Sequence, residues 1–195
     1  MTDTIAAVAT PPGSGALAII RLSGPQSLRT AQAVVRLKPQ GLKNRQARMA
    51  AALDAEGPID QVVAVFCPGP RSSTGEDVVE LSCHGSLYIQ KRLLAALLKA
   101  GARQARPGEF TQRAFLNGRL DLAQAEAVCD LIEAGTRLAH RAALAQLEGG
   151  LSRAVGDARR PILEFLVRLE ANLDHPEEDI PPRFQSCPYI KAMTY

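Results

Sequence analysis

Residues 107–122, with the sequence PGEFTQRAFLNGRLDL, place an acidic residue, two arginines and an asparagine in one short loop–helix–loop segment. Gly108 permits a sharp turn, and Glu109 then falls in the first turn of a helix, where exposed backbone donors favour a carboxylate. Asn117 and Gly118 tolerate a left-handed backbone, so they predict the end of this helix and leave Arg119 beside the exit turn. The side chains expected to be buried are those of Phe110, Ala114 and Phe115. The pattern fits a polar site, and it fits equally well an ordinary capped helix with solvated arginines.

Residues 75–86, GEDVVELSCHGS, predict a turn, a strand and the start of another helix. Side chains alternate between the two faces of a strand. One face is therefore expected to carry Val79, Leu81 and Cys83, and the other Val78, Glu80 and Ser82. The carboxylate of Glu80 can be an outward charge on a half-exposed sheet, or it can accept hydrogen bonds from a ligand with two adjacent N–H donors.

Two apolar strands at the amino terminus, residues 4–9 and 16–22, flank a Pro/Gly loop. Arg21 follows a run of apolar residues and shares a strand face with Leu17 and Ile19, so its guanidinium is expected to emerge near the strand end. That position suits binding of an anion.

The amino-terminal part of the chain is predicted to be an α+β domain with the order ββαβββαβ. Further strands are expected at residues 48–53, 61–66, 77–83 and 103–105, and helices at 25–37 and 86–100. In the second helix Ile89, Leu93 and Leu97 recur every four residues, which predicts that one stripe packs on the sheet.

From Phe110 onward every signal is helical. One apolar stripe consists of Leu122, Ala125, Val128 and Ile132, and a second of Leu144, Leu147, Leu151, Val155, Ala158, Ile162, Phe165 and Leu169. Such stripes are typical of the seams of a helical bundle. Pro161 cannot donate to the helical hydrogen-bond ladder, so a kink or a restart is expected there.

Composition sets only wide bounds on function. With 195 residues, 46% of them apolar, the chain can bury one sizeable core and a helical extension. A net charge of +3 permits an acidic partner, but no concentrated basic stretch indicates nucleic-acid binding. The four cysteines are widely separated, which favours reduced, mostly buried thiols over a zinc site or a disulfide framework. No stretch approaches a membrane-spanning length and no signal peptide is evident, so the cytoplasm is expected.

Four motifs in order resemble the front part of the bacterial and organellar tRNA-modification GTPases known as MnmE or TrmE. They are TIAAVATPPGSGALAIIRLSG, GEDVVELSCHG, RPGEFTQRAFLNGRLDLAQAEAVCDLIEAGT and EEDI, and the resemblance covers residues 4–182. Three residues depart from the family pattern: Ser14 stands where arginine is usual, Ser86 where glycine is usual, and Arg119 where lysine is common.

The resemblance implies a domain at residues 1–118 that binds 5-formyl- or 5,10-methylenetetrahydrofolate and dimerises. Arg21, Glu80 and Arg119 match the family's ligand contacts, and no catalytic or metal-binding residue is expected. This domain is implied to resemble half of the folate-binding domain of the aminomethyltransferases, which a homodimer completes. A partial helical domain is implied at residues 119–182, and the tail at 183–195 matches nothing recognisable and is expected to be disordered.

The parent family inserts a GTPase domain into its helical domain, but this sequence contains no Gly-x-x-x-x-Gly-Lys-Ser/Thr phosphate loop. The family's carboxy-terminal Cys-Ile-Gly-Lys signature is absent as well. GTP, Mg²⁺ and K⁺ are therefore implied only for the full-length family protein, as are a flavoprotein partner of the MnmG or GidA type and, indirectly, tRNA. Whether this chain is itself an enzyme stays open, and no membrane partner is expected.

Two other functions fit the residues. The chain could be a scaffold that only dimerises and docks a partner, with Arg21, Glu80 and Arg119 in structural ion pairs. A stand-alone folate-dependent transferase is the weaker idea, because the sequence shows no acid–base or nucleophile constellation beyond His84. That histidine is expected to pack or to cap a helix, with a secondary ligand contact as the alternative.

Overall fold

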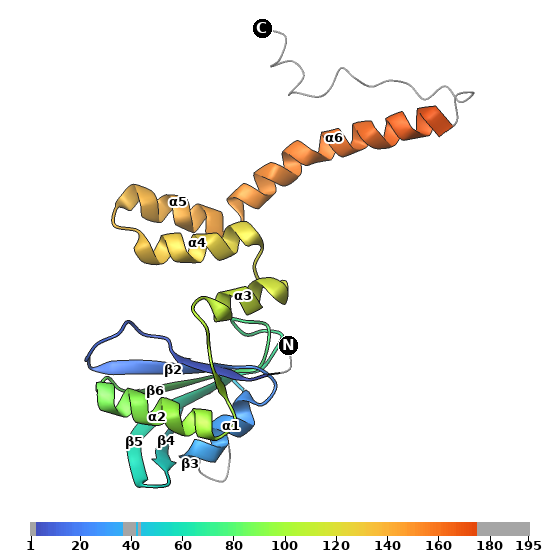
Figure 1. The fold of residues 1–195 in the computed structure, drawn as a ribbon. Coiled ribbons are helices and arrows are strands. Elements are labelled where there is room, and N and C mark those ends of the chain that lie inside the picture. The colour runs from blue at the N-terminus through green and yellow to red at the C-terminus, as the bar shows by residue number, and fades with distance from the viewer. Residues whose placement is uncertain (1–2, 37–41, 43, 175–195) are drawn as a thin grey trace. The chain divides into compact units, whose positions relative to one another are not determined.

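A mixed seven-stranded sheet organises the amino-terminal half of the chain in the computed structural model, which describes residues 3–36, 42 and 44–174 (Figure 1). The chain divides into two compact units, Met1–Ala125 and Glu126–Tyr195. The tail predicted at residues 183–195 lies outside the described residues, as does the EEDI motif.

The strand order in the sheet is β3-β4-β5-β6-β2-β1-β7. All neighbouring strands are antiparallel except β1 and β7, which are parallel. The strands are β1 (Ile5–Val8), β2 (Leu17–Ser23), β3 (Val35–Arg36), β4 (Arg48–Asp54), β5 (Gly57–Cys67), β6 (Val78–His84) and β7 (Arg103–Gln104).

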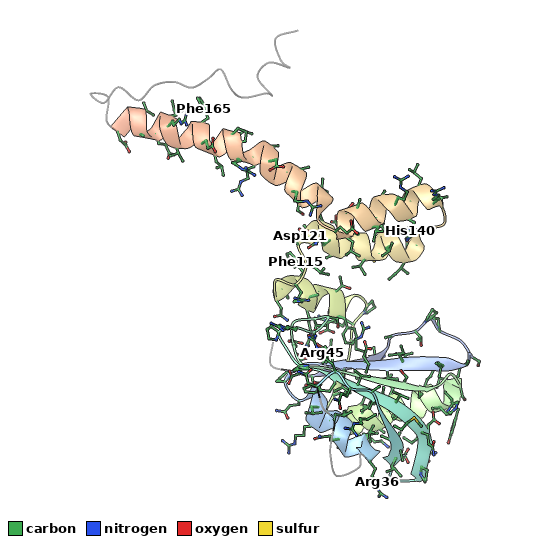
Figure 2. All side chains as sticks on the ribbon, turned by 180° about the vertical axis from the view of Figure 1, so that it is seen from behind. Arg36, Arg45, Phe115, Asp121, His140 and Phe165 are labelled. Carbon is green, nitrogen blue, oxygen red and sulfur yellow. The ribbon has the colours of Figure 1, made fainter. Side chains whose placement is uncertain are left out.

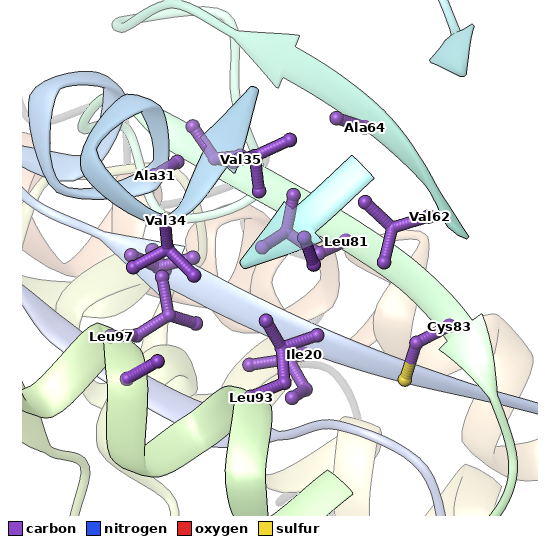
Figure 3. Close-up of a cluster of buried hydrophobic side chains, with 14 of the residues drawn as sticks. Ile20, Ala31, Val34, Val35, Val62, Ala64, Leu81, Cys83, Leu93 and Leu97 are labelled. Atoms are coloured by element: carbon purple, nitrogen blue, oxygen red, sulfur yellow. The ribbon is translucent and has the colours of Figure 1, made fainter. Parts of the chain in front are cut away.

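Two helices, α1 (Ser27–Val34) and α2 (Leu87–Lys99), bury one face of this sheet. Figure 3 shows their side chains, including Val34, Leu93 and Leu97, packed against Ile20 of β2 and Leu81 of β6. The α2 stripe predicted from the sequence is confirmed, since Leu93 and Leu97 are fully buried and Ile89 packs against the core.

The predicted α+β class is confirmed, with one change to the order of elements. The helix predicted over residues 25–37 ends at Val34, because the chain becomes extended at Val35 and pairs with β4 as the short strand β3. Val35 is β-branched and buried, which favours an extended backbone that packs it against the core. The last helical turn that was predicted here is therefore replaced by this edge strand.

Helix α3 (Glu109–Leu116) begins and ends much as predicted. Gly108 has a left-handed backbone with φ of 72°, and Gly118 has φ of 67°. Asn117, the other residue expected to tolerate a left-handed backbone, has a negative φ of −89°. The burial prediction was wrong for Phe115, which is 41% exposed, because the buried face of α3 is formed instead by Glu109, Arg113 and Ala114.

The carboxy-terminal helices are α4 (Leu122–Glu133), α5 (Arg137–Leu147) and α6 (Gly150–Asp174). Asp121 and Gln124 form a capping box before α4, in which each side chain accepts a hydrogen bond from the other residue's backbone N–H. Thr136 caps α5 by accepting from the backbone N–H of Ala139. The helical organisation predicted after Phe110 is confirmed.

Helix α6 runs without a break through Pro161, so the chain does not restart there (Figure 2). The kink, which was the other half of the prediction, stays a prediction. Most of this helix is solvent-exposed, and water can take up the carbonyl that loses its partner to the proline. The stripe predicted as a bundle seam is largely exposed: Leu151, Val155, Ile162, Phe165 and Leu169 are between 42% and 60% exposed. In α4 the buried residue is Ala127, whereas Leu122 and Ile132 of the expected stripe are exposed. No helix in the described part of the chain has both the length and the apolarity needed to cross a bilayer.

Candidate functional site

Arg21 and Glu80 face each other across strands β2 and β6, which are neighbours in the sheet (Figure 1). Nε and Nη2 of Arg21 each lie 2.8 Å from Oε1 of Glu80. The side chains are 30% and 34% exposed, so the pair is open to solvent. Both contacts use the same oxygen, and Oε2 of Glu80 has no hydrogen-bond partner within residues 3–36, 42 and 44–174. A carboxylate oxygen is thus available to a ligand.

The residues around this pair on the sheet are mostly apolar, with Ser82 as the polar neighbour. The register places Ala7 of β1 opposite Arg21, and Val65 of β5 opposite Glu80. The next row of the same face runs through Ile19, Ser82 and Val63. This face lies opposite the one that α1 and α2 cover, because the alternating residues Ile20, Val79 and Leu81 are fully buried in the core. The predicted alternation along residues 78–83 is thereby confirmed.

Phe110, from the first turn of α3, lies beside the Arg21–Glu80 pair. The guanidinium carbon of Arg21 lies 5.7 Å from the centroid of the Phe110 ring, within the range of a cation–π contact. A half-buried aromatic ring, a guanidinium and a carboxylate therefore adjoin an apolar sheet surface. That combination suits a flat heterocycle with polar edges.

No hydrogen bond or ion pair joins Arg119 to Arg21 or Glu80 among the described residues. Its side chain has no carboxylate within 4.0 Å among the described residues, and its stem lies against Gly75, in the loop before β6. A Cβ atom added at Gly75 would be 3.2 Å from Cγ of Arg119. The structure therefore joins two of the three predicted contacts and places the third beside the segment that leads to Glu80.

A cluster of ion pairs around Arg113, which the sequence analysis did not identify, lies between α3 and the sheet edge. We name it the Arg113 cluster. It consists of Arg103, Arg106 and Arg113 with Asp3, Glu76 and Glu109. A signal was present in the sequence: Arg113 follows Glu109 by four positions and Phe110 by three, which puts it on the helix face that was expected to be buried.

Glu109 is the most strongly perturbed acid of this cluster. Its side chain is 2% exposed, and it accepts from Nη1 and Nη2 of Arg103 at 3.1 and 2.6 Å and from the backbone N–H of Arg106 at 2.8 Å. The hydrogen bonds from Arg103 lower the pKa of Glu109 to about 2, against the opposing effect of burial. Hydrogen bonds from Arg103, and then from Arg113, also lower the pKa of Asp3.

His84 is neither packed nor a helix cap, contrary to the expectation. Its side chain is 67% exposed, and its Nδ1 lies 2.7 Å from Oδ1 of Asp60. Asp60 also accepts from the backbone N–H of His84 at 2.8 Å. The partner comes from β5, 24 residues earlier, which local sequence context did not show.

The three cysteines among the described residues belong to no group that could hold a metal ion. Cys67, Cys83 and Cys129 are free thiols, and within the described residues no group of three or more His, Cys, Asp or Glu side chains could hold a metal ion. Burial raises the pKa of the Cys83 thiol. The expectation of mostly buried thiols was wrong for Cys129, which is exposed on α4, and Cys187 lies outside the described residues.

Comparison with known proteins assigns both parts of the chain. Residues 4–119 match the family described as the GTP-binding protein TrmE N-terminus, and residues 122–190 match the MnmE helical domain. The tRNA modification GTPase MnmE of Cytophaga hutchinsonii is 48% identical over 180 residues, covering 92% of this chain and 39% of the relative. The proteins of the same name from Akkermansia muciniphila and Chloroflexus aurantiacus are 48% and 47% identical, covering 93% and 99% of this chain and 42% and 43% of their own length. The chain thus spans about two fifths of these relatives, and it belongs to the MnmE (TrmE) family of tRNA modification GTPases.

Proposed function

We propose that this chain is the part of a tRNA modification GTPase that binds a reduced folate and dimerises, with Glu80, Arg21 and Arg119 as ligand contacts. The ligand is 5-formyl- or 5,10-methylenetetrahydrofolate. The observation that carries the proposal is the half-exposed Arg21–Glu80 pair on an apolar sheet surface beside Phe110.

The chemistry of a pterin matches these groups. Its amino group and ring N–H lie side by side, and one carboxylate can accept from both, as Glu80 could through its free Oε2 and a displaced Oε1. The flat faces of the pterin suit the apolar sheet surface and the Phe110 ring. Arg21 and Arg119 then serve the pteridine carbonyl and the glutamate carboxylates of the ligand.

Dimerisation is proposed because large apolar side chains remain exposed on the same sheet face. Leu17 of β2 is 68% exposed, and Met49 of β4 is 65% exposed. The register puts both on the face of Arg21 and Ile19. A second copy that covers this face would bury both side chains and lie close to the ligand, so that binding and assembly are coupled.

In the intact family protein, we propose that GTP hydrolysis, with Mg²⁺ and K⁺, drives rearrangement during modification of the tRNA wobble uridine. A flavoprotein of the MnmG type is the partner, and the folate supplies the one-carbon unit for the carboxymethylaminomethyl group. These steps belong to the cytosol. The chain has no GTPase activity of its own in this proposal, because its sequence lacks the phosphate loop.

Calorimetric titration of the chain with 5-formyltetrahydrofolate tests the proposal. We expect binding in the micromolar range that is lost in Glu80→Ala. The matched control is Glu56→Ala, which removes a carboxylate that is 80% exposed in the turn between β4 and β5 and should leave binding unchanged. Binding that survives Glu80→Ala would remove the proposed site.

A scaffold function is the alternative, and two observations favour it. Arg21 and Glu80 already neutralise each other's charge as a cross-strand ion pair, and α6 exposes a row of apolar side chains that could dock a partner. A folded dimer that produces no heat with 5-formyltetrahydrofolate would support this scaffold.

A further inference from the structure

Arg113 has no exposed surface, and its guanidinium joins three segments that are distant in the sequence. Nη1 donates to the backbone oxygen of Asp3 and to Oε2 of Glu76, both at 2.9 Å. Nη2 donates to Oδ1 of Asp3 at 2.7 Å and lies 3.5 Å from Oε1 of Glu109. Arg113 therefore fastens α3 to the segment before β1 and to the loop before β6.

Glu76 connects Arg113 to strand β2. Its Oε2 also accepts from Oγ of Ser23, the last residue of β2, at 2.8 Å. Oγ of Ser23 in turn lies 2.7 Å from Oγ1 of Thr74, and both of these side chains are buried. Glu76 is thus held by the helix on one side and by the strand of Arg21 on the other.

Gly75, the neighbour of Glu76, is in contact with the side-chain stem of Arg119. Its φ of 79° and its missing side chain allow the loop to approach the exit of α3 closely. A Cβ atom there would lie 2.9 Å from Cβ of Asn117 and 3.2 Å from Cγ of Arg119. Nδ2 of Asn117 donates to the backbone oxygen of Thr74 at 2.7 Å, which holds the two segments together.

Stability alone gives a weak reason for a fully buried arginine at this place. Removing charges from water is costly, and well-packed apolar residues often replace a buried ion cluster with no loss of stability. What an apolar residue cannot supply is direction: the two Nη groups of Arg113 fix the orientation of Glu76 by hydrogen bonds of defined geometry.

We infer that Arg113 is a positioning residue for the ligand contact Arg119, acting through Glu76 and Gly75. The inference rests on the proposed folate-binding function, since Arg119 is a ligand contact only in that proposal. Arg113 itself touches no ligand.

A double-mutant cycle on the whole chain tests this, with the affinity for 5-formyltetrahydrofolate measured by calorimetry. We expect Arg113→Met to weaken binding about tenfold in the wild-type background, and by less than about twofold when Arg119→Ala is already present. A merely structural Arg113 would weaken binding by the same factor in both backgrounds, and that result overturns the inference. An Arg119→Ala variant with unchanged affinity overturns it as well.

Arg92→Met is the matched control, because it removes a mostly buried arginine that, like Arg113, is paired with a carboxylate. Arg92 donates to both oxygens of Asp54 at 2.7 Å, far along the sheet on β4. Its loss should leave the affinity unchanged. If Arg113→Met does not fold, Glu76→Gln replaces it in the same cycle, because this substitution keeps the side-chain size and removes the charge that Arg113 binds.

The failures of the two proposals are distinguishable. If the wild-type chain does not bind 5-formyltetrahydrofolate, the proposed function and the inference both fall. If the wild-type chain binds, Glu80→Ala abolishes binding and the cycle is additive, only the role of Arg113 falls.

Discussion

Glu80 and Arg21 form an ion pair that contributes little to the stability of the fold. Ion pairs that are open to solvent contribute about 0 to 1 kcal/mol to stability, because water screens the charges and both side chains lose freedom. With about a third of each side chain exposed, a ligand can displace Arg21 from Glu80 at small cost. The same pair can therefore stabilise the empty sheet surface and accept the N–H donors of a heterocycle.

Glu109 is the opposite case, a carboxylate that the fold needs in its charged form. Its pKa is about 2 in the folded chain, because of the hydrogen bonds from Arg103, against an ordinary value of 4.5. A lowered pKa means that its contribution to stability is fully present above about pH 4.5 and is lost as the pH falls towards 2.

Urea unfolding between pH 7 and pH 2.5 checks this for Glu109. The free energy of unfolding of the wild type should fall more steeply below pH 4.5 than that of Glu109→Gln, which has no charge to lose there. Glu56→Gln, at an exposed position, should retain the wild-type slope. Parallel curves for the wild type and Glu109→Gln would contradict the role given to the Arg113 cluster.

At the scale of elements, the contact between the loop before β6 and the exit of α3 depends on Gly75. Gly75→Ala combines a left-handed backbone with a clash against Asn117, whereas Gly101→Ala has φ of 111° but open space around its Cβ. We expect the clash to cost about 1 to 3 kcal/mol beyond the backbone strain that both variants share. Chemical denaturation measures the difference, and equal losses for the two variants would show that the loop does not press on α3.

The elements differ in how far the sequence could predict them. Period-two alternation was enough to separate Glu80 from Leu81 and to group Arg21 with Ile19, because it depends on neighbours along one strand. That Arg21 and Glu80 meet depends on the pairing of β2 with β6, which this pattern does not contain. The burial of Arg113 depends on Asp3 and Glu76, which are 110 and 37 residues away, so no local pattern could show its partners.

The same limit explains the errors in the helices. Phe115 was expected inside because it is large and apolar, yet the ion cluster occupies the buried face of α3. Pro161 was expected to kink α6 or to make it restart. The helix does not restart, because a proline in an exposed helix loses a hydrogen bond that water can replace.

At the scale of the whole molecule, the exposed sheet face predicts the dimer contact. Leu17→Glu and Met49→Glu would place a charge on that face, and each should shift the chain towards monomers in light scattering. Tyr88→Glu, at a 66% exposed position on α2, is the control and should leave the mass unchanged. If all three variants retain the wild-type mass, the dimer contact lies elsewhere.

The proposed function depends on one ligand lying against Glu80 and Arg21. A crystal structure of the chain with 5-formyltetrahydrofolate tests this most directly. We expect the amino and ring N–H groups of the pterin to donate to the Glu80 carboxylate at about 2.7 to 3.2 Å, with Arg21 and Arg119 on the carbonyl and carboxylate groups of the ligand. A pterin bound away from Glu80, with the Arg21–Glu80 pair undisturbed, would contradict it.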